Sequence, residues 1–243
     1  MDPTDIGFII GTSFGNAYRL TGNPSYQSVL ITAGTSLAGL YNPTVGAVRS
    51  WTFPQYNFPV IIDSMMTLGP LQWGATNGGS ASWATIAATH STTVTNNLVR
   101  SDGSTFQVAN FNGMTGALIS QSTFSGLSAD STWARGEAWA LYGFTQEYQT
   151  SDNPAFLTTA ENLANYFVGQ LLADGTWIPP WDFDAPGTFV DTSAAAIAAD
   201  GLIMLSTVAG GTLGAMYLTD AEDILGRPPA ATSTIRIRLA NPC

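Results

Sequence analysis

The chain has 243 residues, enough for one large domain, and the 45% that are hydrophobic can build a sizeable core. Seven arginines, no lysine and 17 acidic residues give a formal net charge of −10, which argues against nucleic acid as a partner. Because there is one cysteine and one histidine, the sequence excludes a disulfide framework and a zinc site built from cysteines or histidines.

No unbroken apolar run is long enough to span a bilayer, so no membrane contact is expected. The opening segment, MDPTDIGF, has no basic-then-apolar signal peptide, and an extracellular location would require a segment upstream of it. The compartment and the oligomeric state stay open.

Four helical hairpins are predicted along the chain, each made of two helices joined by a short turn. The first helices are rich in Gly, Ala and Ser and apolar on nearly every face, which is typical of buried helices. They are expected at 5–20, 63–75, 135–148 and 191–205. The second helices have more polar positions and are expected at 27–40, 84–99, 157–172 and 213–225. Inner helices ringed by outer ones indicate an all-α fold, an α/α toroid of helical hairpins.

Strands are expected only in the long third connection. Two short ones, at 105–110 and 115–120, flank Asn112-Gly113, a dipeptide typical of a hairpin turn. Four hairpins are too few for a closed ring of six, so the toroid is expected to be incomplete at both ends.

The C-terminal segment differs in composition from the rest of the chain. Residues 226–243 contain three of the seven arginines and no acid. We expect a partial barrel domain at 1–225 and a divergent tail at 226–243. A disordered or β-like tail and a truncated gene product are both open interpretations of this change.

Acidic residues open the predicted inner helices. Asp5, Asp63, Glu137 and Asp191 all lie near such starts, and equivalent ends of inner helices point to the same rim of a toroid. Asp5 and Asp63 are therefore expected to meet across one pocket. Asp63 lies in the apolar run VIIDSMM, where an ionised carboxylate is costly. The alternative is that each acid is an N-cap or first-turn residue favoured by the helix dipole.

Aromatic residues accompany these acids, as in carbohydrate sites, where carboxylates transfer protons and rings stack on sugar faces. For each tryptophan, a place in the core is the competing interpretation. His90 is expected to be structural or exposed, and Asp182 and Asp184 to be turn acids.

Six stretches are typical, in order and spacing, of one enzyme family. They are TDIGFIIGTSFGNAYRLTGNPSY, IIDSMMTLGPLQWGA, HSTTVTNNLVRSDGSTFQVANF, STWARGEAWALYGF, PPWDFDAPG and DTSAAAIAADGL. In this combination the chain resembles the unsaturated glucuronyl hydrolases, glycoside hydrolase family 88, over roughly residues 4–225.

The resemblance implies an incomplete (α/α)6 barrel that acts, without metal or organic cofactor, on oligosaccharides with a 4,5-unsaturated glucuronyl residue at the non-reducing end. The acid at Asp63 would protonate C4 of the double bond and help water add at C5, so that the resulting hemiketal collapses and the glycosidic bond breaks. Asp5 would tune and orient Asp63. The residues expected to bind the substrate are Trp73, Gln107, Arg135, Glu137, Trp139 and Trp181.

A general acid works best when its pKa lies near the ambient pH. Apolar neighbours and a second carboxylate raise the pKa of an acid, whereas a helix N-terminus lowers it. We expect the first two effects to prevail at Asp63.

Several positions depart from the family pattern. Thr4 and Gln107 stand where histidine is common, Glu137 where glutamine is usual, and Val190 where arginine is usual. These changes remove positive groups and add a negative one. The alternative function is therefore a truncated, catalytically impaired barrel remnant that binds sugar at most, and a third is a helical repeat that binds protein partners.

Overall fold

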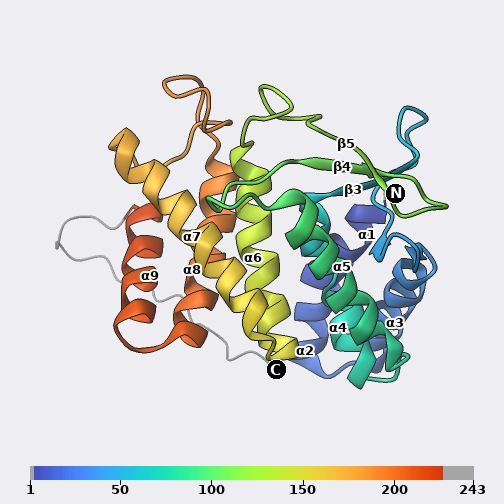
Figure 1. Ribbon diagram of the computed structural model, residues 1–243. Helices are drawn as coiled ribbons and strands as arrows, with labels where there is room; N and C mark the ends of the chain where they lie inside the picture. Colours follow the sequence, from blue (N-terminus) through green and yellow to red (C-terminus); the bar gives the residue numbers. More distant parts are fainter. Residues whose placement is uncertain (1–2, 227–243) are drawn as a thin grey trace.

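The structure is a computed structural model that describes residues 3–226, and most of them are helical (Figure 1). The first half contains α1 (Pro3–Ile10), η1 (Gly11–Gly15), α2 (Asn16–Thr21), α3 (Pro24–Ala38), β1 (Tyr41–Asn42), β2 (Ala47–Val48), β3 (Phe58–Ile61), η2 (Ile62–Thr67), α4 (Gly69–Thr76) and α5 (Ser82–Leu98). The second half contains β4 (Val108–Phe111), β5 (Leu118–Ser122), α6 (Ala134–Ser151), α7 (Pro154–Asp174), α8 (Thr192–Ala209) and α9 (Gly211–Ile224).

The helices form an arc of hairpins, as the sequence predicts. The inner row runs from α1 through η2 and α4 to α6 and α8. Both η2 and α4 contact α1 on one side and α6 on the other, and α6 contacts α8. The outer row is formed by α3, α5, α7 and α9, which pack against α4, α6 and α8. The partial α/α barrel predicted for this fold class is confirmed over the described residues.

Turn residues cap the helices in the predicted manner. The Asn23 side chain accepts a hydrogen bond from the Ser25 N–H, and Asn153 accepts one from Ala155, so each satisfies a free donor of the helix that follows. Asp191 does the same for α8 through the Ala194 N–H. These caps fix where α3, α7 and α8 begin.

The first inner helix is interrupted. Residues 5–20 form α1, a π-helical turn at η1, and α2, rather than one regular helix. Exposed apolar side chains such as Ile9 and Leu20 also show that this segment is less buried than predicted. The prediction used only the 3.6-residue period, which a π-helical turn breaks without any marker residue.

The second inner helix is also broken. A 3-10 helix, η2, covers Asp63, and α4 starts afresh at Gly69 with Pro70 in its first turn. The predicted continuous helix over 63–75 is wrong because the Pro70 ring occupies a position suited to the start of a helix and not to its interior.

Two glycines let helices approach η2 closely. A Cβ on Gly7 of α1 would lie 2.1 Å from the Thr67 carbonyl oxygen, and one on Gly143 of α6 would lie 2.4 Å from the Met65 Cβ. Only glycine fits such contacts without moving the backbone. The approach of α1 brings the residues near Asp5 against the element that carries Asp63.

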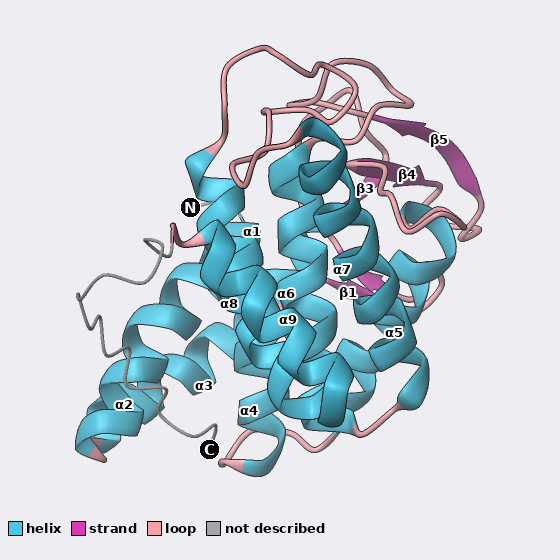
Figure 2. Cartoon of the chain, turned by 90° about the vertical axis from the view of Figure 1, so that its left-hand side faces the viewer, coloured by secondary structure: helices cyan, strands magenta, loops and turns pink. Residues whose placement is uncertain are grey.

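The strands β3, β4 and β5 lie at one end of the helices, beside the long loops (Figure 2). β4 pairs with β5 and with β3, both antiparallel, and β1 pairs with β2. β4 and β5 confirm the two predicted strands, displaced by a few residues. β1, β2 and β3 were not predicted. β1 and β2 have only two residues each, and β3 is a four-residue apolar run that contains Pro59 and shows no alternation of apolar and polar residues.

The helix α8 is, by length and composition, apolar enough to cross a membrane. It packs between α6 and α9, and 39% of it is buried, including alanines and leucines on the side of these contacts. Of the predicted tail at 226–243, residues 227–243 lie outside the described residues.

Candidate active site

A pocket of about 340 Å³ holds both acids that the sequence singled out. Asp5 enters it from α1 and Asp63 from η2, as the equivalent positions of two inner helices require. The rest of its lining is Phe8, Trp51, Phe53, Ile61, Met66, Thr67, Gln107, Phe124, Ser125 and Trp139. The pocket is therefore largely apolar, with two carboxyl groups from neighbouring inner helices.

Asp63 lies in the first turn of η2 with one carboxyl oxygen, Oδ2, buried and without a hydrogen-bond partner among the described residues. Burial raises its pKa to about 7, against a smaller lowering by its own backbone N–H and by the Arg135 guanidinium. An unpaired buried carboxyl is costly, and the protein tolerates it by keeping the group protonated to near neutral pH. Such a group can donate a proton under physiological conditions.

Asp5 is exposed and is not among the causes of the shift at Asp63. The expected direction of the shift is confirmed, but its source is burial, not a second carboxylate. Asp5 keeps the place expected of it, on the wall of the same pocket.

His90 supports η2 from the outer helix α5. The Val48 N–H donates to its Nδ1 at 3.0 Å, and its Nε2 lies 2.8 Å from the Ser64 hydroxyl oxygen. Burial lowers the pKa of His90 to about 4, so the ring is neutral and its Nε2–H donates to Ser64. The Ser64 hydroxyl in turn donates to the Ile61 carbonyl. His90 is thus structural, as expected, and it fixes the backbone on both sides of Asp63.

We expect His90→Ala to lower the free energy of unfolding by about 2–4 kcal/mol, because it leaves a cavity and a buried Val48 N–H without an acceptor. Urea denaturation measures the change. Thr92→Ala, at an exposed position of the same helix, is the matched control and should cost less than about 1 kcal/mol. Equal losses in the two variants would contradict a supporting role for His90.

Gln107 lines the pocket, but its side-chain oxygen is already occupied. Its Oε1 accepts from the Thr123 hydroxyl and from the Phe124 and Ser125 N–H groups, each at 2.7 Å, and its Nε2 donates to the Ser125 hydroxyl at 3.2 Å. Gln107 therefore holds the loop that carries Phe124 and Ser125.

Trp139 of α6 also lines the pocket, with its ring edge-to-face against Phe8 at a centroid distance of 5.0 Å. It packs in a geometry that aromatic pairs favour, so the ring is held in place at the pocket wall.

Arg135 and Trp181 lie in an adjoining pocket of about 420 Å³, which shares Ser125 with the first. Arg135 donates from Nε and Nη2 to Asp191 Oδ2, at 3.0 and 2.8 Å, and its side chain is 40% exposed. The Trp181 ring stacks on Phe189 with centroids 5.3 Å apart. These two predicted residues are near the acids without sharing their pocket.

Glu137 is not among the residues that line the pocket. The side chain is fully buried, with Oε2 accepting from the Thr105 hydroxyl at 2.8 Å and Oε1 unpartnered among the described residues. Burial raises its pKa well above the usual value, despite the Thr105 hydrogen bond and the charge of Arg100. Burial therefore favours the protonated form of Glu137 over the negative charge expected at this position.

Trp73 lies in a third hollow of about 470 Å³, between α2, α4 and α6. Its ring meets Tyr18 edge-to-face at 5.3 Å. This hollow shares only Phe8 and Met66 with the pocket of Asp63, so the geometry does not bring Trp73 to the acids.

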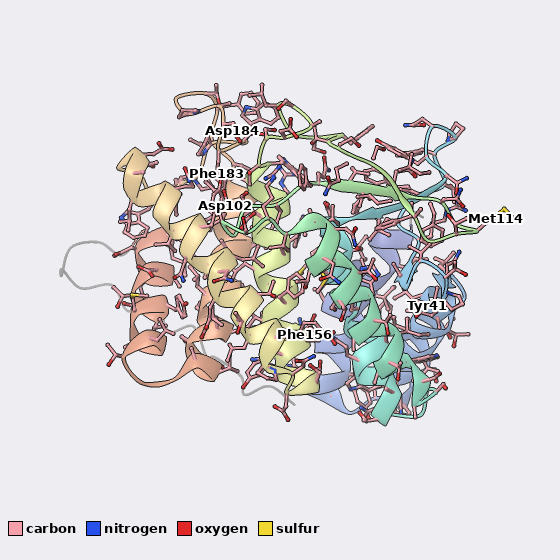
Figure 3. The ribbon with its side chains drawn as sticks, viewed as in Figure 1. Tyr41, Asp102, Met114, Phe156, Phe183 and Asp184 are labelled. Atoms are coloured by element: carbon pink, nitrogen blue, oxygen red, sulfur yellow. The ribbon has the colours of Figure 1, made fainter. Side chains whose placement is uncertain are left out.

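The predicted turn acids hold loops at the end of the helices. Asp182 Oδ2 accepts from the Leu127 N–H and the Ser131 hydroxyl, and Asp184 Oδ2 accepts from the Thr132 N–H. Figure 3 shows Asp184 and Phe183 at this end, above α6 and α7. Within residues 3–226, no group of three His, Cys, Asp or Glu side chains is placed to hold a metal ion.

Sequence reasoning missed the aromatic side of the pocket, formed by Trp51, Phe53 and Phe124. The close pair Trp51 and Phe53, just before a strand, was an available signal. Phe124 had none, because it lies in a loop whose place is fixed by Gln107.

No family model matches the chain. A curated unsaturated glucuronyl hydrolase of Formosa agariphila is 36% identical over 230 residues, which are 91% of this chain and 56% of that protein. A solved unsaturated glucuronyl hydrolase specific for heparin superposes with a TM-score of 0.87 at 38% identity, over 92% of this chain and 61% of that one. The chain belongs to the family of the unsaturated glucuronyl hydrolases.

Further solved structures of unsaturated glucuronyl hydrolases have a similar fold. The structure of one from Bacillus sp. GL1, responsible for the degradation of glycosaminoglycan, has a TM-score of 0.86 at 26% identity and covers 91% of this chain and 60% of that one. The chain spans about half the length of the curated relatives it matches. The shared fold therefore concerns the arc of hairpins that contains Asp5 and Asp63.

Proposed function

We propose that this chain hydrolyses oligosaccharides that carry a 4,5-unsaturated glucuronyl residue at the non-reducing end. The observation that supports this most is Asp63, whose unpartnered carboxyl oxygen and pKa of about 7 suit a general acid, in one pocket with Asp5. The family of its relatives gives the substrate class, and the aromatic lining suits a sugar ring.

The reaction begins with proton transfer from the Asp63 carboxyl to C4 of the double bond. The oxygen of a water molecule adds at C5. The water gives one proton to the Asp63 carboxylate, which restores the acid, and leaves a hydroxyl group on C5. The hemiketal at C5 opens to a ketone, which leaves a hemiacetal at C1. This hemiacetal releases the next sugar as an alcohol and becomes an aldehyde, so that one water is consumed in total.

Asp5, at the exposed side of the pocket, orients the water and Asp63. Trp139 offers a fixed ring face, and Arg135 and Trp181 contact the saccharide from the adjoining pocket. Arg135 is the cation that acts on Asp63, and it is the group best suited to an anionic part of the sugar. Glu137 and Trp73 remain predictions that the geometry does not support.

Incubation of the chain with an unsaturated glucuronyl disaccharide tests the proposal, with loss of the double-bond absorbance as the readout. We expect kcat/KM to be constant at low pH and to fall about tenfold per unit as pH rises above about 7, because Asp63 then loses its proton. If a cooperatively folded chain leaves the absorbance unchanged, the activity is wrong and an impaired remnant is the better reading. A profile flat between pH 5 and 9 would remove Asp63 as the acid.

A further inference from the structure

Two phenylalanines stand exposed at the rim of the Asp63 pocket. Phe53 is 37% exposed and Phe124 is 62% exposed, although both belong to the lining of the pocket. Their ring centroids lie 6.0 Å apart with an interplanar angle of 31°, so the two rings form one continuous apolar surface. An exposed apolar surface at the mouth of a pocket that contains carboxyl groups is typical of a ligand-binding surface.

A buried ring supports this pair from below. Trp51 is 7% exposed and lies with its centroid 5.3 Å from Phe53 and 5.6 Å from Phe124. It packs in turn against Ile61 of β3 and Val108 of β4, and β3 leads directly into η2. The exposed rings are therefore connected to the scaffold that carries Asp63.

The backbone under Phe124 is also fixed. Gln107 Oε1 accepts from the N–H groups of Phe124 and Ser125 and from the Thr123 hydroxyl, which closes the loop around a side chain from the segment before β4. A ring that is held in its bound position before the ligand arrives loses little entropy on binding. Gln107, predicted to touch substrate, thus shapes the wall instead.

The charged groups near the wall are acidic. Among the described residues, the carboxyl groups of Asp5 and Asp63 are the titratable members of the pocket lining. Arg49, at the base of the Phe53 loop, has its guanidinium on the Asn57 carbonyl and over the Phe58 ring. Arg135 lies beyond Ser125 in the adjoining pocket, where it is paired with Asp191. A sulfate on a sugar lying against this wall would therefore meet aromatic carbon and two carboxyl groups within this pocket.

From these observations we infer that Phe53 and Phe124 form the wall of the leaving-group subsite, where they stack on the ring of an uncharged second sugar. The inference rests on the proposed function and adds the chemistry of the sugar that is released. In this inference the two rings bind the second sugar and take no part in the proton transfer.

Removal of both rings tests the stacking. In Phe53→Ala/Phe124→Ala, we expect KM for an unsulfated unsaturated chondroitin disaccharide to rise about tenfold or more, with kcat changed less than about twofold. The methyl glycoside of unsaturated glucuronic acid has no second ring, so its kcat/KM should change less than about twofold. Equal losses on both substrates, or no loss on either, would overturn the inference. Met114→Ala, 90% exposed at the far edge of the sheet in Figure 3, is the control and should change neither substrate.

A sulfated substrate tests the charge. The wild-type chain should process the disaccharide sulfated at the 6-position of the second sugar with a kcat/KM at least about tenfold lower than the unsulfated one. Equal or faster turnover of the sulfated disaccharide would overturn the uncharged subsite.

If the chain cleaves neither the disaccharide nor the methyl glycoside, the proposed function fails. Titration calorimetry of the unsulfated disaccharide then decides: weaker binding in the double variant supports the wall, and unchanged binding overturns it.

Discussion

The Asp63→Asn variant is expected to hydrolyse an unsaturated glucuronyl disaccharide at least about a thousandfold more slowly than the wild-type chain. Asparagine has nearly the same shape as aspartic acid but cannot give up a proton to C4 of the double bond. Because Oδ2 of Asp63 has no partner among the described residues, the amide breaks no hydrogen bond of that oxygen. The loss should therefore appear in kcat, with KM changed less than about threefold, and it is measured by the disappearance of the double-bond absorbance.

Two other variants separate this role from general charge effects. Asp5→Asn removes the second acid of the pocket and should lower kcat less than Asp63→Asn does, because Asp5 transfers no proton in the proposed reaction. Asp152→Asn is the matched control outside the pocket, at an exposed position with φ of 52° that asparagine tolerates. If Asp63→Asn keeps more than about a tenth of the wild-type kcat, another group is the acid.

The hairpins were predictable because each is specified locally. Helix periodicity, the Asn-Pro turns at Asn23 and Asn153, and repeated patterns along the chain all indicate the same four units, and the structure has them. The strand β3 was not predictable in this way. Its four residues gain their conformation from pairing with β4, about fifty positions later, and such pairing leaves no periodic signal in so short a run.

The acids of the site could be predicted, and most of their surroundings could not. Asp5 and Asp63 open equivalent inner helices, so the repeat alone brings them to one rim. The surroundings of Gln107 and Glu137 are formed by segments distant from them in sequence. Gln107 holds the loop that carries Phe124, and Glu137 is buried against Thr105. Residue type at a family position therefore indicates chemistry only when its neighbours are known.

A second large effect concerns stability, because two further carboxyl groups are buried in the core. Glu147 of α6 accepts a hydrogen bond from the Gln72 side chain, and burial raises its pKa to about 7. Burial raises the pKa of Glu137 well above its usual value. In the unfolded chain both groups ionise near pH 4.5, so between that pH and about 7 the folded state binds more protons than the unfolded state. The free energy of unfolding should therefore fall as pH rises over this window.

Glutamine at either position mimics the protonated acid, and it should remove the corresponding part of this decline. We expect Glu147→Gln to raise the free energy of unfolding by about 2–3 kcal/mol at pH 8 and by less than about 1 kcal/mol at pH 4. Glu137→Gln should be stabilising in the same direction, because the amide oxygen can still accept from Thr105. Urea denaturation at the two pH values measures both. Glu161→Gln, on the partly exposed face of α7, is the control and should give the same small change at each pH. If Glu147→Gln is destabilising at pH 8, the ionised form must be the one that the core accommodates, and the assigned direction of the shift is wrong.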